Sequence, residues 1–258
     1  MDLAEHLELA LSLADDADEL TMDRFRSIDL HFDTKPDRTP VTEADHAVER
    51  AVRLRLAEHV QEYAVVGEEF GIEGDDDAEF RWIIDPIDGT KGYLRGLPVW
   101  ATLLALEHRG QLVLGVVSAP ALGTRWWAAR GRGAYRNGEP MTVSAVHDIR
   151  DAHLSFAWDT NESIERGGLD QRLFALGRQC WRVRSFGDFW HHMLVAEGAI
   201  DISIDPAAAW WDLAAIAVIV EEAGGRATDL QGVPRADGGN IVCTNRRLHA
   251  RVLELLAP

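Results

Sequence analysis

The feature that most constrains the fold is a change in the pattern of apolar segments near residue 151. Before it, short β-type runs follow one another at 64–66, 80–84, 99–106, 112–117 and 125–129. After it, apolar segments of strand and helix length alternate, which is typical of layered α/β architecture. No linker or repeat separates the halves. We therefore expect an α/β (α+β) chain with a sheet-rich lobe (residues 1–150) and an α/β lobe (residues 151–258) in one compact unit.

Local signals predict the individual elements. Helical spacing of apolar residues marks 3–25, and Thr42-Glu43-Ala44-Asp45 has the form of a capping box that opens a second helix. The segment 108–110 joins two strands as a hairpin, and Asn137-Gly138 is a strong turn signal. In the second half we expect strands at 153–157, 181–184, 199–204 and 240–244, and helices at 171–178, 189–197, 212–223 and 246–256.

Composition narrows the class of protein. The 258 residues carry 43 acidic and 26 basic side chains, a formal charge of −17, which disfavours nucleic acid and anionic lipid as partners. No apolar stretch reaches the length of a membrane span, and the N-terminal residues lack the order of a secretory signal. Cys180 and Cys243 match no metal-ligand spacing. These features predict a cytoplasmic protein.

The most informative segment is Trp82-Ile83-Ile84-Asp85-Pro86-Ile87-Asp88-Gly89-Thr90. An apolar strand is expected to end at Ile84, because proline cannot donate to the strand ladder, and the chain then turns both aspartates into one cleft. Oxygen ligands without nearby cysteine or histidine favour Mg²⁺. An ordinary Asp-Pro-Gly turn is the alternative interpretation.

Two further carboxylates occupy comparable positions. Glu68 in Gly67-Glu68-Glu69 follows the apolar run 64–66, and Asp212 opens a long apolar helix. Each also has a simpler interpretation, since Glu68 could be a solvated loop charge and Asp212 a carboxylate that interacts with the helix dipole.

Taken together, these motifs resemble the inositol monophosphatase family of Mg²⁺-dependent phosphomonoesterases. The resemblance rests on Gly67-Glu68-Glu69, on the segment 85–90, and on Trp211-Asp212-Leu213-Ala214-Ala215 with Glu222-Ala223-Gly224-Gly225 behind it. It implies an alternating αβαβα layered sandwich, a homodimer, and two or three Mg²⁺ ions. The implied metal ligands are Glu68, Asp85, Asp88, Asp212 and the backbone carbonyl of Ile87.

The resemblance also implies roles in catalysis. Glu68 and Thr90 would hold the attacking water, and Asp45, within the matching segment 41–45, would polarise the Thr90 hydroxyl. The capping box offers Asp45 a competing role that does not exclude the first. The phosphate would bind to the backbone N–H groups of Gly89 and Thr90, beside a helix that starts near Lys91.

The choice of phosphate ester rests on residues outside the metal set. Asp205 lies where the family places an acidic residue against the alcohol part of the substrate, and Asp188 adds a second carboxylate. Carboxylates suit a cationic alcohol. The segments 116–121, 125–131 and Gly187-Asp188 resemble the histidinol-phosphatase branch. Asp188 has the alternative role of a helix N-cap, and Arg184 would either contact the substrate or brace Asp188.

Several alternatives remain open at this level. Inositol-1-phosphate or another small phosphate ester is the nearest rival substrate, and a non-catalytic regulatory scaffold is the rival of a different class. The adjacent residues His191 and His192 suggest a pair of metal ligands. Because neighbouring helix residues point about 100° apart and no histidine follows at i+4, a partly exposed helix face is expected instead.

Overall fold

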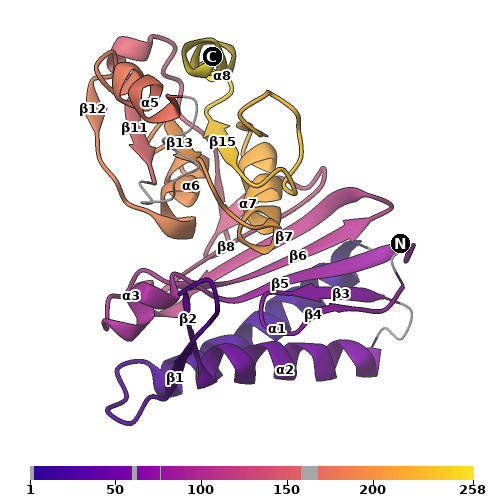
Figure 1. Cartoon of the computed structure of the whole chain (residues 1–258). Helices are drawn as coiled ribbons and strands as arrows, with labels where there is room; N and C mark the ends of the chain where they lie inside the picture. The colour runs from indigo at the N-terminus through magenta and orange to yellow at the C-terminus, as the bar shows by residue number, and fades with distance from the viewer. Residues whose placement is uncertain (1–2, 60–62, 76, 158–167) are drawn as a thin grey trace.

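The computed structural model describes residues 3–59, 63–75, 77–157 and 168–258, and five layers of helix and sheet are stacked in it (Figure 1). Two helices cover the outer face of a large sheet, two more lie between this sheet and a smaller one, and a third pair covers the far face of the smaller sheet. The predicted αβαβα layered sandwich is confirmed.

The large sheet is mostly antiparallel and has the strand order β10-β9-β8-β7-β6-β5-β3-β4. The exception is the parallel pair of β3 and β5, so that the C-terminal ends of these two strands lie at the same end of the sheet. The strands are β3 (Ala64–Gly67), β4 (Gly71–Glu73), β5 (Phe80–Asp88), β6 (Ala101–His108), β7 (Gln111–Ala119), β8 (Thr124–Ala129), β9 (Ala134–Arg136) and β10 (Glu139–Met141).

Helices α1 (Leu3–Arg24) and α2 (Glu43–His59) pack on one face of the large sheet. Leu13 and Val52, for example, are fully buried against strand residues such as Trp82 and Leu114. A two-stranded ribbon of β1 (Phe32–Thr34) and β2 (Pro40–Thr42) connects the two helices. This ribbon was not predicted, because three-residue strands carry too short a pattern.

The smaller sheet is mixed, with the strand order β12-β11-β13-β15-β14. Its strands are β11 (His153–Phe156), β12 (Arg182–Val183), β13 (Ile202–Asp205), β14 (Arg226–Thr228) and β15 (Ile241–Thr244). Its helices are α5 (Leu169–Gly177) and α8 (His249–Leu256) outside, and α6 (Asp188–Ala196) and α7 (Trp210–Glu222) inside. In the part of the chain described, no helix is long and apolar enough to cross a membrane.

The inner helix α7 joins the two halves. It is apolar on nearly all sides, as expected for a helix buried between two sheets. Gly115 of β7 lets the two backbones approach, since a Cβ atom there would lie 2.5 Å from the carbonyl oxygen of Ala215. The large sheet thereby positions the N-terminal turn of α7, which carries Asp212.

Candidate metal and phosphate site

Asp85 and Asp88 lie on strand β5, which is longer than predicted. The expectation that the strand ends at Ile84 is wrong, because pairing with β6 resumes at Asp88 and Ala101 after a bulge. Pro86 lies in this bulge and needs no N–H for the ladder there. The carbonyl of Pro86 instead accepts a hydrogen bond from the Thr102 hydroxyl at 2.7 Å.

Asp85 is at the centre of the predicted carboxylate set. Its side chain is buried, and its Oδ1 atom has no hydrogen-bond partner among the described residues. Burial raises the pKa of Asp85 well above its usual range, and the nearby charges of Glu68, Asp88 and Asp212 raise it further. A buried acceptor surrounded by negative charge is a site that a cation would stabilise.

Asp88 and Asp212 each accept a hydrogen bond from the backbone at a helix start. Asp88 Oδ2 accepts from the N–H of Phe189 in α6 at 2.6 Å, and Asp212 Oδ2 accepts from the N–H of Ala209 before α7 at 2.7 Å. The simpler interpretation of Asp212 as a helix-end carboxylate is therefore partly correct. Burial, together with the charges of Glu68 and Asp205, raises the pKa of Asp212 to about 7.

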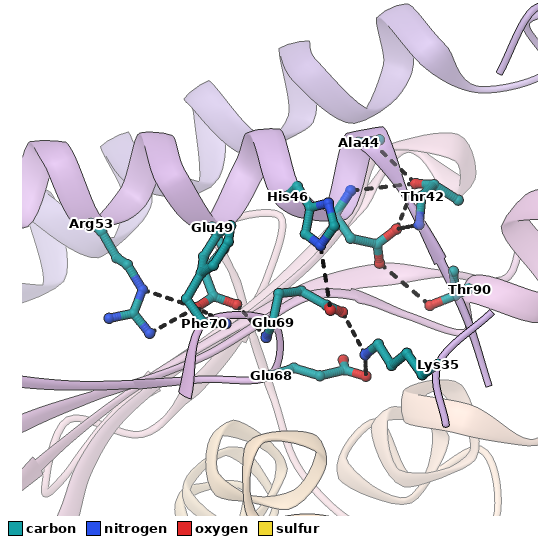
Figure 2. Close-up of polar contacts among 11 residues, drawn as sticks. Lys35, Thr42, Ala44, His46, Glu49, Arg53, Glu68, Glu69, Phe70 and Thr90 are labelled. Carbon is teal, nitrogen blue, oxygen red and sulfur yellow. Dashed lines mark hydrogen bonds and ion pairs between the residues drawn. The ribbon is translucent and has the colours of Figure 1, made fainter. Parts of the chain in front are cut away.

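Glu68 follows β3 and makes an ion pair that the sequence did not predict. Lys35, from the turn between β1 and β2, lies with its Nζ atom 2.7 Å from Oε1 of Glu68 and 2.7 Å from Oε1 of Glu69 (Figure 2). No periodic or motif signal links Lys35 to residues more than thirty positions away. Its ammonium group supplies positive charge next to the carboxylate set.

Glu49 is a second residue that sequence reasoning missed. It is fully buried on α2, is paired with Arg53 at 2.8 Å, and accepts hydrogen bonds from the backbone N–H groups of Glu69 and Phe70 (Figure 2). Glu49 and Arg53 show the i,i+4 spacing of a helix ion pair, which was the available signal. Through these bonds α2 fixes the turn that carries Glu68.

Asp45 makes the contacts of the capping box and also lies near Thr90. In the capping box, its Oδ2 atom accepts from the N–H of Thr42 at 2.8 Å, and the Thr42 hydroxyl accepts from Ala44 N–H (Figure 2). Its Oδ1 atom lies 3.4 Å from the Thr90 hydroxyl oxygen, which also donates to the Ile87 carbonyl at 2.9 Å. Burial raises the pKa of Asp45 to about 6, although the hydrogen bonds from Thr42 oppose this shift.

A cavity of about 300 Å³ lies where α6, α7, β13 and the end of β5 meet. Its charged lining residues are Asp88, Lys91, Asp188, Asp205 and Asp212. Arg184 is not among the residues that line it, and its guanidinium donates to the carbonyl of Val183. The structure thus brings four of the predicted carboxylates to one cavity with Lys91.

The alternative N-cap role of Asp188 is wrong. Gly187 is the N-cap of α6, Asp188 is the first helical residue, and no side chain of the helix makes the capping bond. Asp88 of the large sheet accepts a hydrogen bond from the N–H of Phe189, the second residue of the helix. Asp188 has a φ of 46°, in the left-handed region where aspartate and asparagine are the best tolerated non-glycine residues.

The expected exposure of the histidine pair is also wrong. His191 and His192 are fully buried, because α6 lies between the two sheets and has no solvent-facing side at these positions. In the part of the chain that the structure describes, one group of possible metal ligands has its ligand atoms within 4.8 Å of one another. It consists of His191, His192 and Asp205. Among the described residues, no three of the predicted carboxylate ligands of magnesium have ligand atoms that close together.

The residues present nevertheless fit Mg²⁺ chemically. The set consists of carboxylate oxygens and one carbonyl, the ligands that Mg²⁺ prefers. The unpartnered Oδ1 atom of buried Asp85 offers an acceptor without a donor, and mutual repulsion raises the pKa values of Asp85 and Asp88 beyond the effect of burial.

We expect metal-free protein to become more stable as pH falls from about 8 to about 6. Asp45 has a pKa of about 6, and Glu69 and Asp212 have pKa values of about 7, all above those of unfolded chains. The pKa values of Asp85 and Asp88 are raised as well, so five carboxyl groups favour proton binding by the folded chain. Buried His192 and His249, whose pKa values are lowered to about 4, act in the opposite direction, and we expect the larger carboxyl set to decide the sign, so that stability increases toward low pH. Melting temperatures in chelator, compared with saturating Mg²⁺, check this; a flat profile in chelator would contradict it.

Comparison with known proteins places this site in a family. The family model described as "Inositol monophosphatase family" matches residues 2–257. A histidinol-phosphatase of Mycobacterium tuberculosis is 51% identical over 98% of both chains, and one of Streptomyces coelicolor is 48% identical over 99% of this chain and 98% of the relative. The solved structure of the extragenic suppressor protein suhB of Bartonella henselae superposes with a TM-score of 0.90, at 26% identity and 98% coverage of both chains. The resemblance drawn from the motifs is thereby confirmed, and the chain belongs to the inositol monophosphatase family.

Proposed function

We propose that the chain hydrolyses histidinol phosphate to histidinol and phosphate, with Mg²⁺ as cofactor and water as nucleophile, in histidine biosynthesis. The observation that carries the proposal is the cavity in which Asp188 and Asp205 add two carboxylates to Asp88 and Asp212. The ammonium group of histidinol suits such a wall, because charge-assisted hydrogen bonds are about twice as strong as neutral ones. The names of the two relatives at 51% and 48% identity support the same substrate.

We assign the metal ligands as the sequence predicts them. Two or three Mg²⁺ ions would be held by Glu68, Asp85, Asp88, Asp212 and the carbonyl of Ile87. When bound, they supply charge neutralisation at the phosphoryl and leaving-group oxygens and make a water molecule more acidic. The net charge of −17 and the carboxylate set then become compatible with an anionic substrate.

The residues of the chain itself would position and deprotonate the water. Glu68 and the Thr90 hydroxyl would hold it, and Thr90 would pass its proton to Asp45, whose Oδ1 atom lies 3.4 Å away. The pKa of Asp45, about 6, suits a group that accepts a proton near neutral pH. No covalent phosphoenzyme is required.

Gly89 and Thr90 would bind the phosphate through their backbone N–H groups at the start of α3 (Thr90–Leu94). Gly89 has a φ of 86°, and a Cβ atom there would lie 3.0 Å from the carbonyl oxygen of Val99. Both observations require glycine at this position. The small residue also leaves space for close approach of an anion.

Phosphate release from a panel of esters tests the proposal. After removal of metal by a chelator, turnover would be measured over a range of Mg²⁺ concentrations. The substrates are histidinol phosphate, myo-inositol 1-phosphate and an aryl phosphate whose alcohol part carries no charge. We expect Mg²⁺-dependent turnover with the highest kcat/KM on histidinol phosphate. Preference for myo-inositol phosphate would favour the rival substrate, and no turnover on any ester would favour a non-catalytic scaffold.

The substitution Asp188→Asn should raise KM for histidinol phosphate about 10-fold, equivalent to ~1.4 kcal/mol, with little change in kcat. It removes one charge of the cavity wall and keeps the left-handed backbone, which asparagine also tolerates. The KM for myo-inositol phosphate serves as the internal control and should change little. Unchanged kinetics on histidinol phosphate would remove Asp188 from substrate recognition.

We further propose that the enzyme acts as a homodimer in the cytoplasm. The side chain of Trp181 is 69% exposed, which is unusual for a large aromatic residue and suits a contact with a second copy. Light scattering coupled to gel filtration measures the oligomeric state. A monomer at micromolar concentration would contradict this part of the proposal.

A further inference from the structure

Two buried histidines beside the cavity have no part in the chemistry above, and they lie next to Asp205, which lines the cavity. His191 and His192 extend from α6, and Asp205 ends β13. The two Nε2 atoms of the imidazoles are 2.9 Å apart, and they lie 3.5 Å and 3.4 Å from Oδ2 of Asp205. Both histidines are completely buried. The three donor atoms therefore form a small triangle inside the protein.

The triangle has the dimensions of a metal-ligand face. A point equidistant from its corners lies about 1.9 Å from each atom, and a slight displacement from the plane gives the ~2.0–2.1 Å typical of zinc–imidazole bonds. Asp205 also lines the 300 Å³ cavity. A fourth ligand, such as water, would reach an ion from that side.

The remaining ring nitrogens are held in place by serine hydroxyls. His191 Nδ1 lies 3.0 Å from Ser155 Oγ, and His192 Nδ1 lies 2.8 Å from Ser203 Oγ. Partners of this kind orient metal-binding imidazoles and set their tautomer. When both Nδ1 atoms are protonated, both Nε2 atoms carry a lone pair beside Oδ2 of Asp205, and a bound cation would relieve the repulsion among the three atoms.

We propose that His191, His192 and Asp205 form a second metal site, which binds a transition-metal dication such as Zn²⁺. Two imidazoles and one carboxylate suit zinc, whereas the oxygen-only set around Asp85 suits Mg²⁺. An ion in this site would neutralise Asp205 and alter the charge of the substrate cavity. The site itself does not depend on which ester the enzyme hydrolyses.

Cobalt binding tests the proposal without any measurement of turnover. Full-length protein, stripped by a chelator and then saturated with Mg²⁺ to fill the oxygen-only set, would be titrated with Co²⁺ as a spectroscopic probe. We expect one equivalent to bind, with the intense visible absorption of a four-coordinate site, and to be displaced by Zn²⁺. Elemental analysis after gel filtration gives the stoichiometry.

Two variants and a matched control assign the binding to this cluster. His192→Asn and Asp205→Asn each remove one ligand and should weaken Co²⁺ binding more than ~100-fold, since loss of an outer partner alone costs ~10–100-fold. His249→Asn is the control, because His249 is also buried but contacts Thr228 and Thr244 instead. Circular dichroism checks folding, and if one variant does not fold the other decides.

The results distinguish a metal ion from a shared proton as the group that joins the two imidazoles. Absence of the four-coordinate absorption in the parent protein, or its persistence in a folded His192→Asn or Asp205→Asn variant, would overturn the proposal. The 2.9 Å contact would then be a hydrogen bond in which the two Nε2 atoms share one proton. Because the readout is metal binding, its failure leaves the proposed phosphatase activity untouched.

Discussion

Asp85→Asn should lower kcat/KM at saturating Mg²⁺ by about 10³-fold or more, the largest effect that we expect on activity. The substitution keeps the size of the side chain but removes the charge of the buried carboxylate at the centre of the predicted metal set. Without that charge, the site holds cations poorly, and the phosphoryl oxygens lose their main source of neutralisation.

In the absence of metal, the same substitution should not lower the stability of the folded protein. Burial and the like charges of Glu68, Asp88 and Asp212 disfavour ionised Asp85 in the folded state. Metal-free Asp85→Asn protein should therefore melt no lower than the parent, and the rise in melting temperature on addition of Mg²⁺ should be strongly reduced. Exposed Asp151→Asn is the control. More than a tenth of the parent activity in Asp85→Asn would exclude Asp85 as an essential ligand.

Gly115→Ala should produce the largest loss of stability that we expect, about 1–3 kcal/mol or more, because the added atom would meet the backbone of Ala215 rather than a side chain that can turn away. The added Cβ atom would lie 2.5 Å from the carbonyl oxygen and 3.0 Å from the Cα atom of Ala215. Helix α7 must move away from the sheet to accommodate it. At ~2–4 °C per kcal/mol for a chain near this size, the melting temperature should fall by about 2–12 °C.

The helix movement also predicts a functional effect. Because α7 carries Asp212, Gly115→Ala should weaken the apparent affinity for Mg²⁺ as well as stability. Gly177→Ala is the matched control, since the nearest atoms to its Cβ atom would be side-chain carbons of Val183, at 3.2 Å, and Leu154, at 3.9 Å. Equal melting temperatures of Gly115→Ala and the parent would show that the sheet and α7 do not depend on this close approach.

Elements with strong local signals were predicted well. The apolar spacing in 3–25 and the capping box at Thr42 correspond to α1 and α2, and Asn137-Gly138 joins β9 and β10. In each case, interactions within a few residues determine the conformation. The short strands β1, β4 and β14 were not predicted, because they form through pairing with partners and carry no pattern of their own.

The site residues were predicted or missed for the same reason. The motifs around Glu68, Asp85 and Asp212 were visible because each combines a carboxylate with the end of a strand or the start of a helix. Lys35 and Glu49 were missed, since their contacts to Glu68 and to the N–H groups of Glu69 and Phe70 join segments far apart in the chain. Such contacts leave no local periodicity.

The sequence by itself indicated the family, because short motifs are local properties of the chain, and through that resemblance it indicated the layered architecture. The carboxylates that it assigns to the metal stay a prediction. Only the tertiary structure decided how those groups are paired. It brought the carboxylate of Asp88 to the N–H of Phe189 at the start of α6, and Lys35 to Glu68. It also buried His191 and His192 next to Asp205. The physical reason is that pairing and burial depend on which distant segments share a layer, and adjacent positions in one helix cannot show what packs around them.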